Sequence, residues 1–167
     1  MKTPPPPIPN AYWVQPAQLL AGEYPGALVP AEARRKVAQL QNAGITYFLD
    51  LTEPAELEPY ALYLDNDAVH CRLSIPDFNI PTTAHMITIL DNLDAALDQG
   101  HVVYVHCWGG IGRTGTVVGC YLVRHGWDPT AALDQIARWR QTPPDGHRPS
   151  PETEAQRQMV LRWQEKK

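Results

Sequence analysis

A thiol and a guanidinium are separated by five residues in the stretch VHCWGGIGRTG, residues 105–115. Three of the five residues between Cys107 and Arg113 are glycines, which let successive backbone amides turn inward without a Cβ clash. A helix that starts at such a loop adds unsatisfied N–H groups and the positive end of its dipole. The stretch therefore predicts a cradle for a phosphate or sulfate group. It lacks the Gly-Lys-Ser/Thr ending of a nucleotide-binding loop.

The same loop is suited to make Cys107 a nucleophile. Inward-facing amides and the charge of Arg113 favour the thiolate, which is the reactive form of cysteine. Arg113 can hold two phosphoryl oxygens in its planar fork, and the hydroxyl of Thr114 can donate to the sulfur. We expect Cys71 and Cys120 to be ordinary core residues. The loop residues predicted to contact the substrate are Trp108, Gly109, Gly110, Ile111, Gly112 and Arg113.

His106 directly precedes the candidate nucleophile. We expect its ring to hydrogen-bond the loop and order it. The alternative is a metal site with His101 and Cys107, but these residues alternate along one predicted strand without the spacing of zinc ligands. We therefore predict no metal and no cofactor.

The hydrophobic pattern places this loop between a strand and a helix of an α/β domain. Continuous apolar runs predict strands that are covered on both faces, and a strand pair is expected near residues 12–22. Turn and cap residues mark the predicted helices, the last of which is expected to start with Ser150 as its cap and Pro151 in its first turn. The predicted strands are 45–52, 68–75 and 101–107, and the predicted helices lie within 30–44, 82–100, 115–126, 128–140 and 150–164.

Length and composition set the class of protein. The chain has 167 residues, of which 44% are hydrophobic and 19% charged, as expected for one soluble globular domain. We assign residues 1–10 to a flexible proline-rich tail and 11–167 to the domain. Three cysteines without framework spacing, and no signal peptide or membrane-length apolar run, predict a cytoplasmic protein without a membrane partner. The formal charge of −4 argues against nucleic-acid binding.

The stretch HCWGGIGRTG resembles the Cys-x5-Arg-Ser/Thr signature of the cysteine-dependent protein tyrosine phosphatases. The chain is most similar to small atypical dual-specificity phosphatases, and the likeness extends over nearly all of it after the tail, including LDLTE, LSIPDF and RPSPETEAQ. The resemblance implies an α/β fold with a central, mostly parallel sheet flanked by helices. It also implies a monomeric phosphomonoesterase that works through a phosphocysteine intermediate.

The resemblance assigns further roles by position. Asp77, in SIPDFNIPT, matches the general acid of the family, although Pro76-Asp77 alone also suits a plain turn. Gln156 matches a glutamine that positions the hydrolytic water, or it is a helix-surface residue. Glu152 stands where the tyrosine-specific pattern has another glutamine. Glu53 and Arg148 are expected to brace the site, with ordinary surface charges as the alternative.

The substrate class follows from what is missing around the signature. The chain is too short for the deep cleft of the tyrosine-specific domains, and its loop lacks the lysines of the lipid phosphatases. We therefore expect a phosphorylated protein as substrate, with phosphotyrosine and phosphoserine or phosphothreonine both accepted. The alternatives are a non-protein phosphate, such as an inositol phosphate, a phospholipid or an RNA 5′ end, and a phospho-binding module with little turnover.

Overall fold

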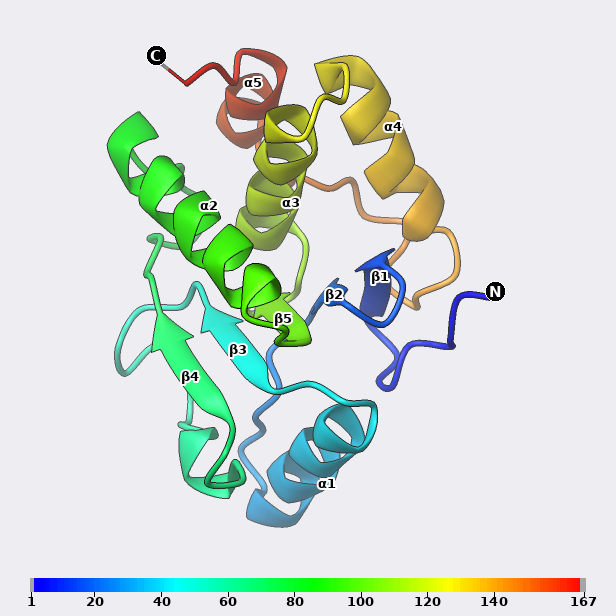
Figure 1. The fold of residues 1–167 in the computed structure, drawn as a ribbon, viewed down its shortest axis with the longest axis vertical. Coiled ribbons are helices and arrows are strands. Elements are labelled where there is room, and N and C mark those ends of the chain that lie inside the picture. The colour runs from blue at the N-terminus through cyan, green and yellow to red at the C-terminus, as the bar shows by residue number, and fades with distance from the viewer. Residues whose placement is uncertain (1, 166–167) are drawn as a thin grey trace.

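A single five-stranded sheet organises the computed structural model, which describes residues 2–165. The strands lie in the order β1-β2-β5-β3-β4, and the segments between them form helices on both faces (Figure 1). The predicted α/β class is therefore confirmed. The strands are β1 (Ala11–Gln15), β2 (Leu19–Gly22), β3 (Tyr47–Asp50), β4 (Val69–Arg72) and β5 (Val103–His106), and the helices are α1 (Pro30–Asn42), a short 3-10 helix (Ala61–Tyr63), α2 (Thr83–Asp98), α3 (Gly112–Arg124), α4 (Pro129–Trp139) and α5 (Glu154–Leu161).

The pairing of the strands brings four chain segments to one edge of the sheet. β2, β5, β3 and β4 run parallel, and only β1, at one side, is antiparallel to its neighbour β2. In register, His106 is opposite both Gly22 and Asp50, and Asp50 is opposite Arg72. All four parallel strands therefore end at the same level, where ligands bind in open α/β sheets.

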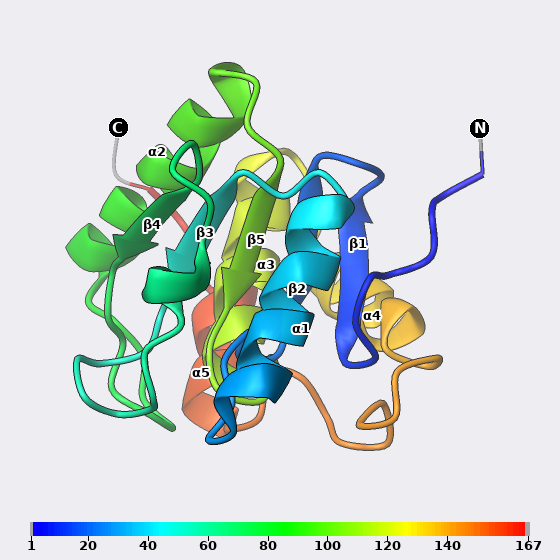
Figure 2. The same ribbon diagram turned by 90° about the horizontal axis from the view of Figure 1, so that it is seen from below.

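Two hydrophobic cores hold the helices to the sheet. One face packs against α1 through side chains that include Phe48, Tyr104 and Leu40. The other face packs against α2, α3, α4 and α5, and this larger core includes Leu93, Val105 and Ile136. Figure 2 shows α1 and the 3-10 helix on one side of the strands and α2, α3, α4 and α5 on the other. Such burial of continuous apolar strands is the usual condition for a parallel sheet.

Strand β4 departs from the expected cover on both faces. It is the end strand of the sheet, Val69 is exposed, and the other three residues of the strand are half-buried. The interpretation of its apolar run as a fully covered strand is therefore wrong, because a continuous apolar run does not distinguish a central strand from an edge strand.

Helix α5 begins three residues later than predicted. Its cap is Thr153, whose hydroxyl accepts from the backbone N–H of Gln156 while the amide oxygen of Gln156 accepts from the N–H of Thr153. This reciprocal capping box satisfies more backbone groups than a lone serine cap. Ser150, the predicted cap, instead donates its hydroxyl to the carbonyl of Ile111. The side chains of Thr82 and Asp128 cap α2 and α4, and Pro129 stands in the first turn of α4.

The segment before β1 packs against the domain at several points. Ile8 is buried in the α1-side core. Asn10 donates to Glu23 at 3.1 Å, and its side-chain oxygen accepts from the backbone N–H of Asp145 at 3.1 Å. The flexibility of residues 1–10 stays a prediction, but these contacts reach residues near the end of β2 and the loop before α5.

Helices α3 and α5 cross at Gly119, and this contact gives a test of the fold. A Cβ at residue 119 would lie 2.5 Å from Cγ2 and 2.8 Å from Cγ1 of Val160. We expect Gly119→Ala to lower the free energy of unfolding by about 1–3 kcal/mol because the overlap must be relieved by moving α5. Urea unfolding followed by circular dichroism measures this loss.

The control is a double-mutant cycle at the same contact. Val160→Ala removes the atoms that a methyl group at residue 119 would overlap. Its combination with Gly119→Ala should cost less than the sum of the two single losses. Additive losses would show that α3 and α5 do not meet as described.

Candidate active site

The loop that follows β5 is fastened to the end of β2. Gly110 has a φ of 71°, and a Cβ there would overlap the backbone of Gly22 and Glu23. The backbone N–H of Tyr24 donates to the carbonyl of Trp108 at 2.8 Å. Glycine at position 110 is thus required twice, by its left-handed conformation and by the close approach of a neighbouring chain segment.

Helix α3 begins inside this loop and points its N-terminus at a pocket. The helix starts at Gly112, three residues earlier than predicted, and Ile111 before it makes no side-chain cap. The first-turn amides are therefore unsatisfied by a cap and carry the positive end of the helix dipole. Arg113 and Thr114, which belong to this first turn, are buried. The predicted anion cradle has the backbone it needs.

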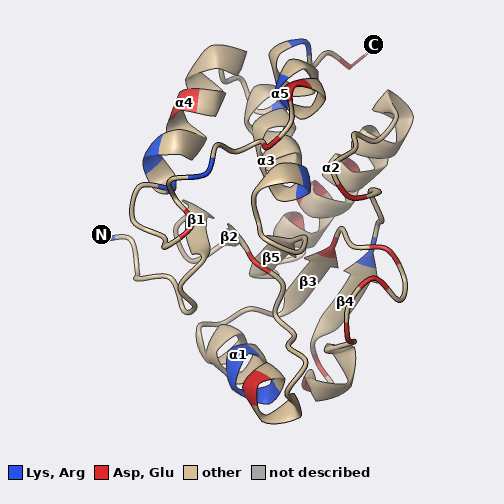
Figure 3. Cartoon of the chain, turned by 180° about the vertical axis from the view of Figure 1, so that it is seen from behind, with Lys and Arg blue, Asp and Glu red and all other residues tan. Residues whose placement is uncertain are grey.

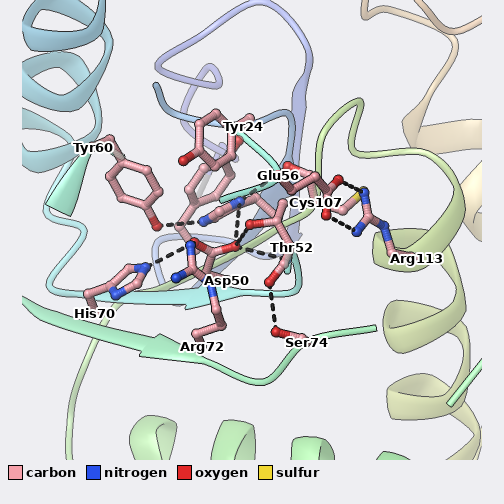
Figure 4. A network of polar contacts seen from close by, with 12 residues as sticks. Tyr24, Asp50, Thr52, Glu56, Tyr60, His70, Arg72, Ser74, Cys107 and Arg113 are labelled. Atoms are coloured by element: carbon pink, nitrogen blue, oxygen red, sulfur yellow. Dashed lines mark hydrogen bonds and ion pairs between the residues drawn. The ribbon is translucent and has the colours of Figure 1, made fainter. Parts of the chain in front are cut away.

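The guanidinium of Arg113 is 1% exposed and is held from one side. Its two terminal nitrogens donate to Glu56 at 2.6 and 2.9 Å, and one also donates to the carbonyl of Ile75 at 3.0 Å (Figure 4). Although burial alone raises the pKa of Glu56, the hydrogen bonds from Arg113 lower it below its usual value, so the pair is ionised at neutral pH. The Nε of Arg113 has no partner among the described residues.

Glu56 takes the bracing position that was predicted for Glu53. The side chain of Glu53 is exposed, and the backbone N–H of this residue donates to Glu56 at 2.8 Å. Both residues lie on the loop after β3, but only Glu56 reaches Arg113. The predicted hydrogen bond from Thr114 to the sulfur of Cys107 is not formed, since the Thr114 hydroxyl has no partner among the described residues.

Asp77 lies in a turn and in the pocket at once. The N–H of Asn79 donates to the carbonyl of Pro76, and Phe78 between them has a φ of 61°. A side-chain oxygen of Asp77 accepts from the N–H of Phe78 at 3.0 Å and lies 3.2 Å from Nη2 of Arg113. Asp77 therefore belongs to a turn and also places its carboxyl group in the pocket. Phe78 adopts a left-handed backbone conformation, which costs of order 1 kcal/mol for a residue other than glycine. This strained residue accompanies the placement of Asp77 in the pocket.

His106 contacts the backbone at the start of the loop and the side chain of Tyr60. Burial lowers its pKa to about 4, so the imidazole is neutral at pH 7. Its Nδ1 lies 3.3 Å from the carbonyl of Cys107 and its Nε2 lies 2.6 Å from the hydroxyl of Tyr60. Since the carbonyl can only accept, Nδ1 carries the proton and the tyrosine donates to Nε2.

A buried carboxylate lies beside this histidine. Asp50 is fully buried and accepts from His70 at 2.9 Å, from Arg72 at 3.2 Å and from the hydroxyl and N–H of Thr52 (Figure 4). Although burial alone raises the pKa of Asp50, hydrogen bonds from His70 and Thr52 hold it well below its usual value. Nδ1 of His106 is 4.0 Å from Asp50. The sheet edge therefore carries a compensated negative charge beneath the loop.

Gln156 is a buried linker rather than a helix-surface residue. Its Oε1 accepts from the N–H of Glu152 and its Nε2 donates to the carbonyl of Asn79, in the turn that carries Asp77. A Cβ at Gly112 would lie about 3 Å from this side chain. Arg148, on the loop before α5, donates to Glu152 at 2.7 Å. These residues form one wall beside the start of α3.

A pocket of about 650 Å³ opens where these segments meet. Cys107 and Arg113 both line it, together with Asp77. The predicted site residues that lie outside the lining are Glu53, His106, Gly110, Thr114 and Gln156. The other predicted site residues in the lining are Trp108, Gly109, Ile111, Gly112 and Arg148, and further lining residues are Glu23, Tyr24, Gly26, Ala27, Leu28, Lys36, Leu57, Glu58, Phe78, Asp145 and Glu152.

Within residues 2–165 no group of three or more His, Cys, Asp and Glu side chains is arranged to hold a metal ion. No helix in the same range is long and apolar enough to span a bilayer.

Known proteins are similar to this chain in sequence and in fold. Residues 9–165 match the family model described as Swiss Army Knife protein, DSP-PTPase phosphatase domain. Phosphatidylglycerophosphate phosphatase PTPMT2 of Arabidopsis thaliana is 35% identical over 96 residues, which cover 55% of this chain and 41% of the plant protein. The PTEN1 phosphatase of the same plant is 28% identical over 138 residues, which cover 77% and 32%. The chain thus spans less than half the length of these two relatives.

Solved structures show the same architecture. Tk-PTP in its active form superposes with a TM-score of 0.73 at 23% identity, over 92% of this chain and 94% of the other. The kinase-associated phosphatase KAP superposes with a TM-score of 0.73 at 22% identity, over 85% and 83%. The predicted mostly parallel sheet is confirmed by this likeness.

The Glu56–Arg113 pair gives a test of the site. Glu56→Gln removes the charge that opposes Arg113 but keeps the shape of the side chain. We expect kcat/KM toward p-nitrophenyl phosphate to fall about tenfold or more, because the guanidinium loses its fixed orientation. The free energy of unfolding should fall by about 1–3 kcal/mol, since a buried charge loses its partner.

Glu53→Gln is the matched control on the same loop. Its exposed side chain should be replaceable with a change in kcat/KM below about twofold. Equal losses in the two variants would show that the loop as a whole, and not the pair, supports the site.

Proposed function

The chain belongs to the DSP-PTPase phosphatase family and is a cysteine-dependent phosphatase, and from this premise we propose that its substrates are phosphorylated protein side chains. The observation that carries the site assignment is the buried Arg113, whose Nε is unpartnered while its other nitrogens are fixed by Glu56. A phosphoryl oxygen is the partner that this nitrogen and the α3 amides suit. Cys107 lines the same pocket.

We propose a two-step reaction in this pocket. In the first step the thiolate of Cys107 forms a bond to phosphorus, the bond between phosphorus and the ester oxygen breaks, and Asp77 gives that oxygen a proton. Arg113 and the loop amides stabilise the charge of the transferring group. In the second step Asp77 takes a proton from water as the water oxygen bonds to phosphorus, and the sulfur leaves as thiolate.

Of two predicted auxiliary roles, that of Gln156 changes in this proposal and that of Thr114 is kept. The amide of Gln156 is engaged with Glu152, Thr153 and Asn79, so we propose that it positions the turn of Asp77 rather than the water. The hydroxyl of Thr114 is free to donate to the sulfur when the thiolate forms, because nothing else in residues 2–165 occupies it.

The pocket's basic side chains support a protein substrate over a polyphosphorylated one. Lys36 lies 3.5 Å from Glu23, and Arg148 lies 2.7 Å from Glu152. Both cations are therefore already neutralised by neighbours. Polyphosphorylated headgroups and RNA 5′ ends need several unopposed cations.

A phospholipid is the second candidate. The relative PTPMT2 is named for phosphatidylglycerophosphate, and Leu28, Phe78 and Trp108 are exposed large apolar residues in the pocket lining. These side chains suit a lipid surface as well as a protein surface. The balance of charge in the lining favours the protein.

The nucleophile is tested by Cys107→Ser. A serine hydroxyl is hardly ionised at neutral pH, so kcat toward a phosphotyrosyl peptide in excess chelator should fall by at least roughly a thousandfold. Binding of tungstate, a tetrahedral phosphate mimic, should persist in isothermal titration because the cradle is intact. Cys71→Ser is the control and should keep its activity. Turnover by Cys107→Ser would contradict the mechanism.

The general acid is tested by the leaving group. Asp77→Asn keeps an oxygen to accept from Phe78 N–H but provides no acidic proton. We expect kcat/KM for phenyl phosphate to fall roughly a hundredfold, because phenoxide leaves poorly without a proton. The loss for an ester of a strongly acidic phenol should be much smaller. An equal loss for both esters would reduce Asp77 to a turn residue.

A further inference from the structure

Acidic side chains outnumber basic ones in the lining of the pocket. Five acidic residues face three basic ones, and Glu56 stands behind Arg113 as a sixth acid. In Figure 3 acidic segments lie in the loops around the start of α3. A bound phosphate monoester adds further negative charge to this region. The acidic lining residues are Glu23, Glu58, Asp77, Asp145 and Glu152, and the basic ones are Lys36, Arg113 and Arg148.

Each basic residue of the lining is paired with an acidic side chain, so none is free to contact the part of a substrate outside its phosphoryl group. Lys36 and Arg148 are paired with acids of the lining, and Arg113 is paired with Glu56 at 2.6 Å. The unpartnered Nε of Arg113 and the α3 amides serve the phosphoryl group at the floor. The lining has five acidic and three basic side chains, so the potential at the mouth of the pocket is negative on balance.

Glu58 and Asp145 carry that potential. Within residues 2–165 neither carboxylate lies within ion-pair distance of a cation. They come from different segments, the loop after β3 and the loop before α5, and both line the pocket. Their charges are thus available to a group that approaches the mouth.

The backbones that bear these two acids are held firmly. The hydroxyl of Tyr24 donates to the carbonyl of Glu58 at 2.7 Å. The carbonyl of Asp145 accepts from the buried Arg140 at 2.7 Å, and its N–H donates to Asn10 at 3.1 Å. A fixed charge loses less entropy on binding a partner than one on a mobile loop.

We propose that Glu58 and Asp145 select protein substrates in which basic residues flank the phosphorylated side chain. This inference rests on the proposed function, because it needs a phosphoryl group on the floor beside Arg113. Lysine or arginine side chains next to that group would meet the two carboxylates at the mouth. Acidic flanking residues, and the surface of an anionic bilayer, would meet like charge there.

The test compares two phosphotyrosyl peptides that differ only in their flanks, with lysines in one and glutamates in the other. Binding is measured on Cys107→Ser, which does not depend on turnover, and kcat/KM is measured on the unaltered chain. We expect the lysine peptide to be preferred at least about fivefold in both. The preference should shrink toward unity at ~1 M salt, where exposed charges are screened within about 3 Å.

Variants assign the preference to the two acids. The combination of Glu58→Gln with Asp145→Asn should reduce it below about twofold. Asp67→Asn, the same charge change at an exposed residue outside the pocket lining, should leave it unchanged. A preference that is absent at the start, or that Asp67→Asn reduces equally, overturns the inference while leaving the phosphatase proposal intact.

Vesicles test the other substrate class. Anionic vesicles that contain phosphatidylglycerophosphate should be hydrolysed more slowly than the lysine peptide. Faster hydrolysis of the vesicles, with no binding of either peptide, would instead overturn the protein substrate itself. The two failures are therefore distinguishable.

Discussion

The burial of one guanidinium constrains the whole site. A cation that is 1% exposed needs compensation, and Arg113 receives it from Glu56 and the carbonyl of Ile75. These partners come from the loops after β3 and β4, so both loops must converge on the first turn of α3. Convergence follows from the parallel register, which ends β3, β4 and β5 at one level. The remaining nitrogen, Nε, has no partner among residues 2–165.

A second buried charge supports the same edge of the sheet. Asp50 is the last residue of β3 and lies beside His106, the last residue of β5. Its partners His70 and Arg72 come from β4. The carboxylate thus joins three strands through polar contacts where their backbone pairing ends. Because His106 also contacts the carbonyl of Cys107, one histidine connects the polar network to the residue that follows β5.

Local sequence signals and long-range contacts differ in how well they could be predicted. The loop from Cys107 to Arg113 is contiguous, so its glycines indicate a cradle without knowledge of the fold. Glu56 carries no such signal, because Glu53 and Glu58 lie on the same loop and only the tertiary structure selects which one meets Arg113. The start of α5 was missed for a similar reason. Ser150 is a good cap by type, but its hydroxyl is taken by Ile111.

Asn10 links the two sides of the pocket mouth, since it contacts both Glu23 and the backbone of Asp145. The segment ahead of Asn10 runs back along β1, away from the sheet edge that carries the pocket (Figure 2). Asn10 itself lies outside the pocket lining. A substitution at residue 10 would therefore reach the pocket only through the two segments that its side chain joins, and it would loosen both of them at once.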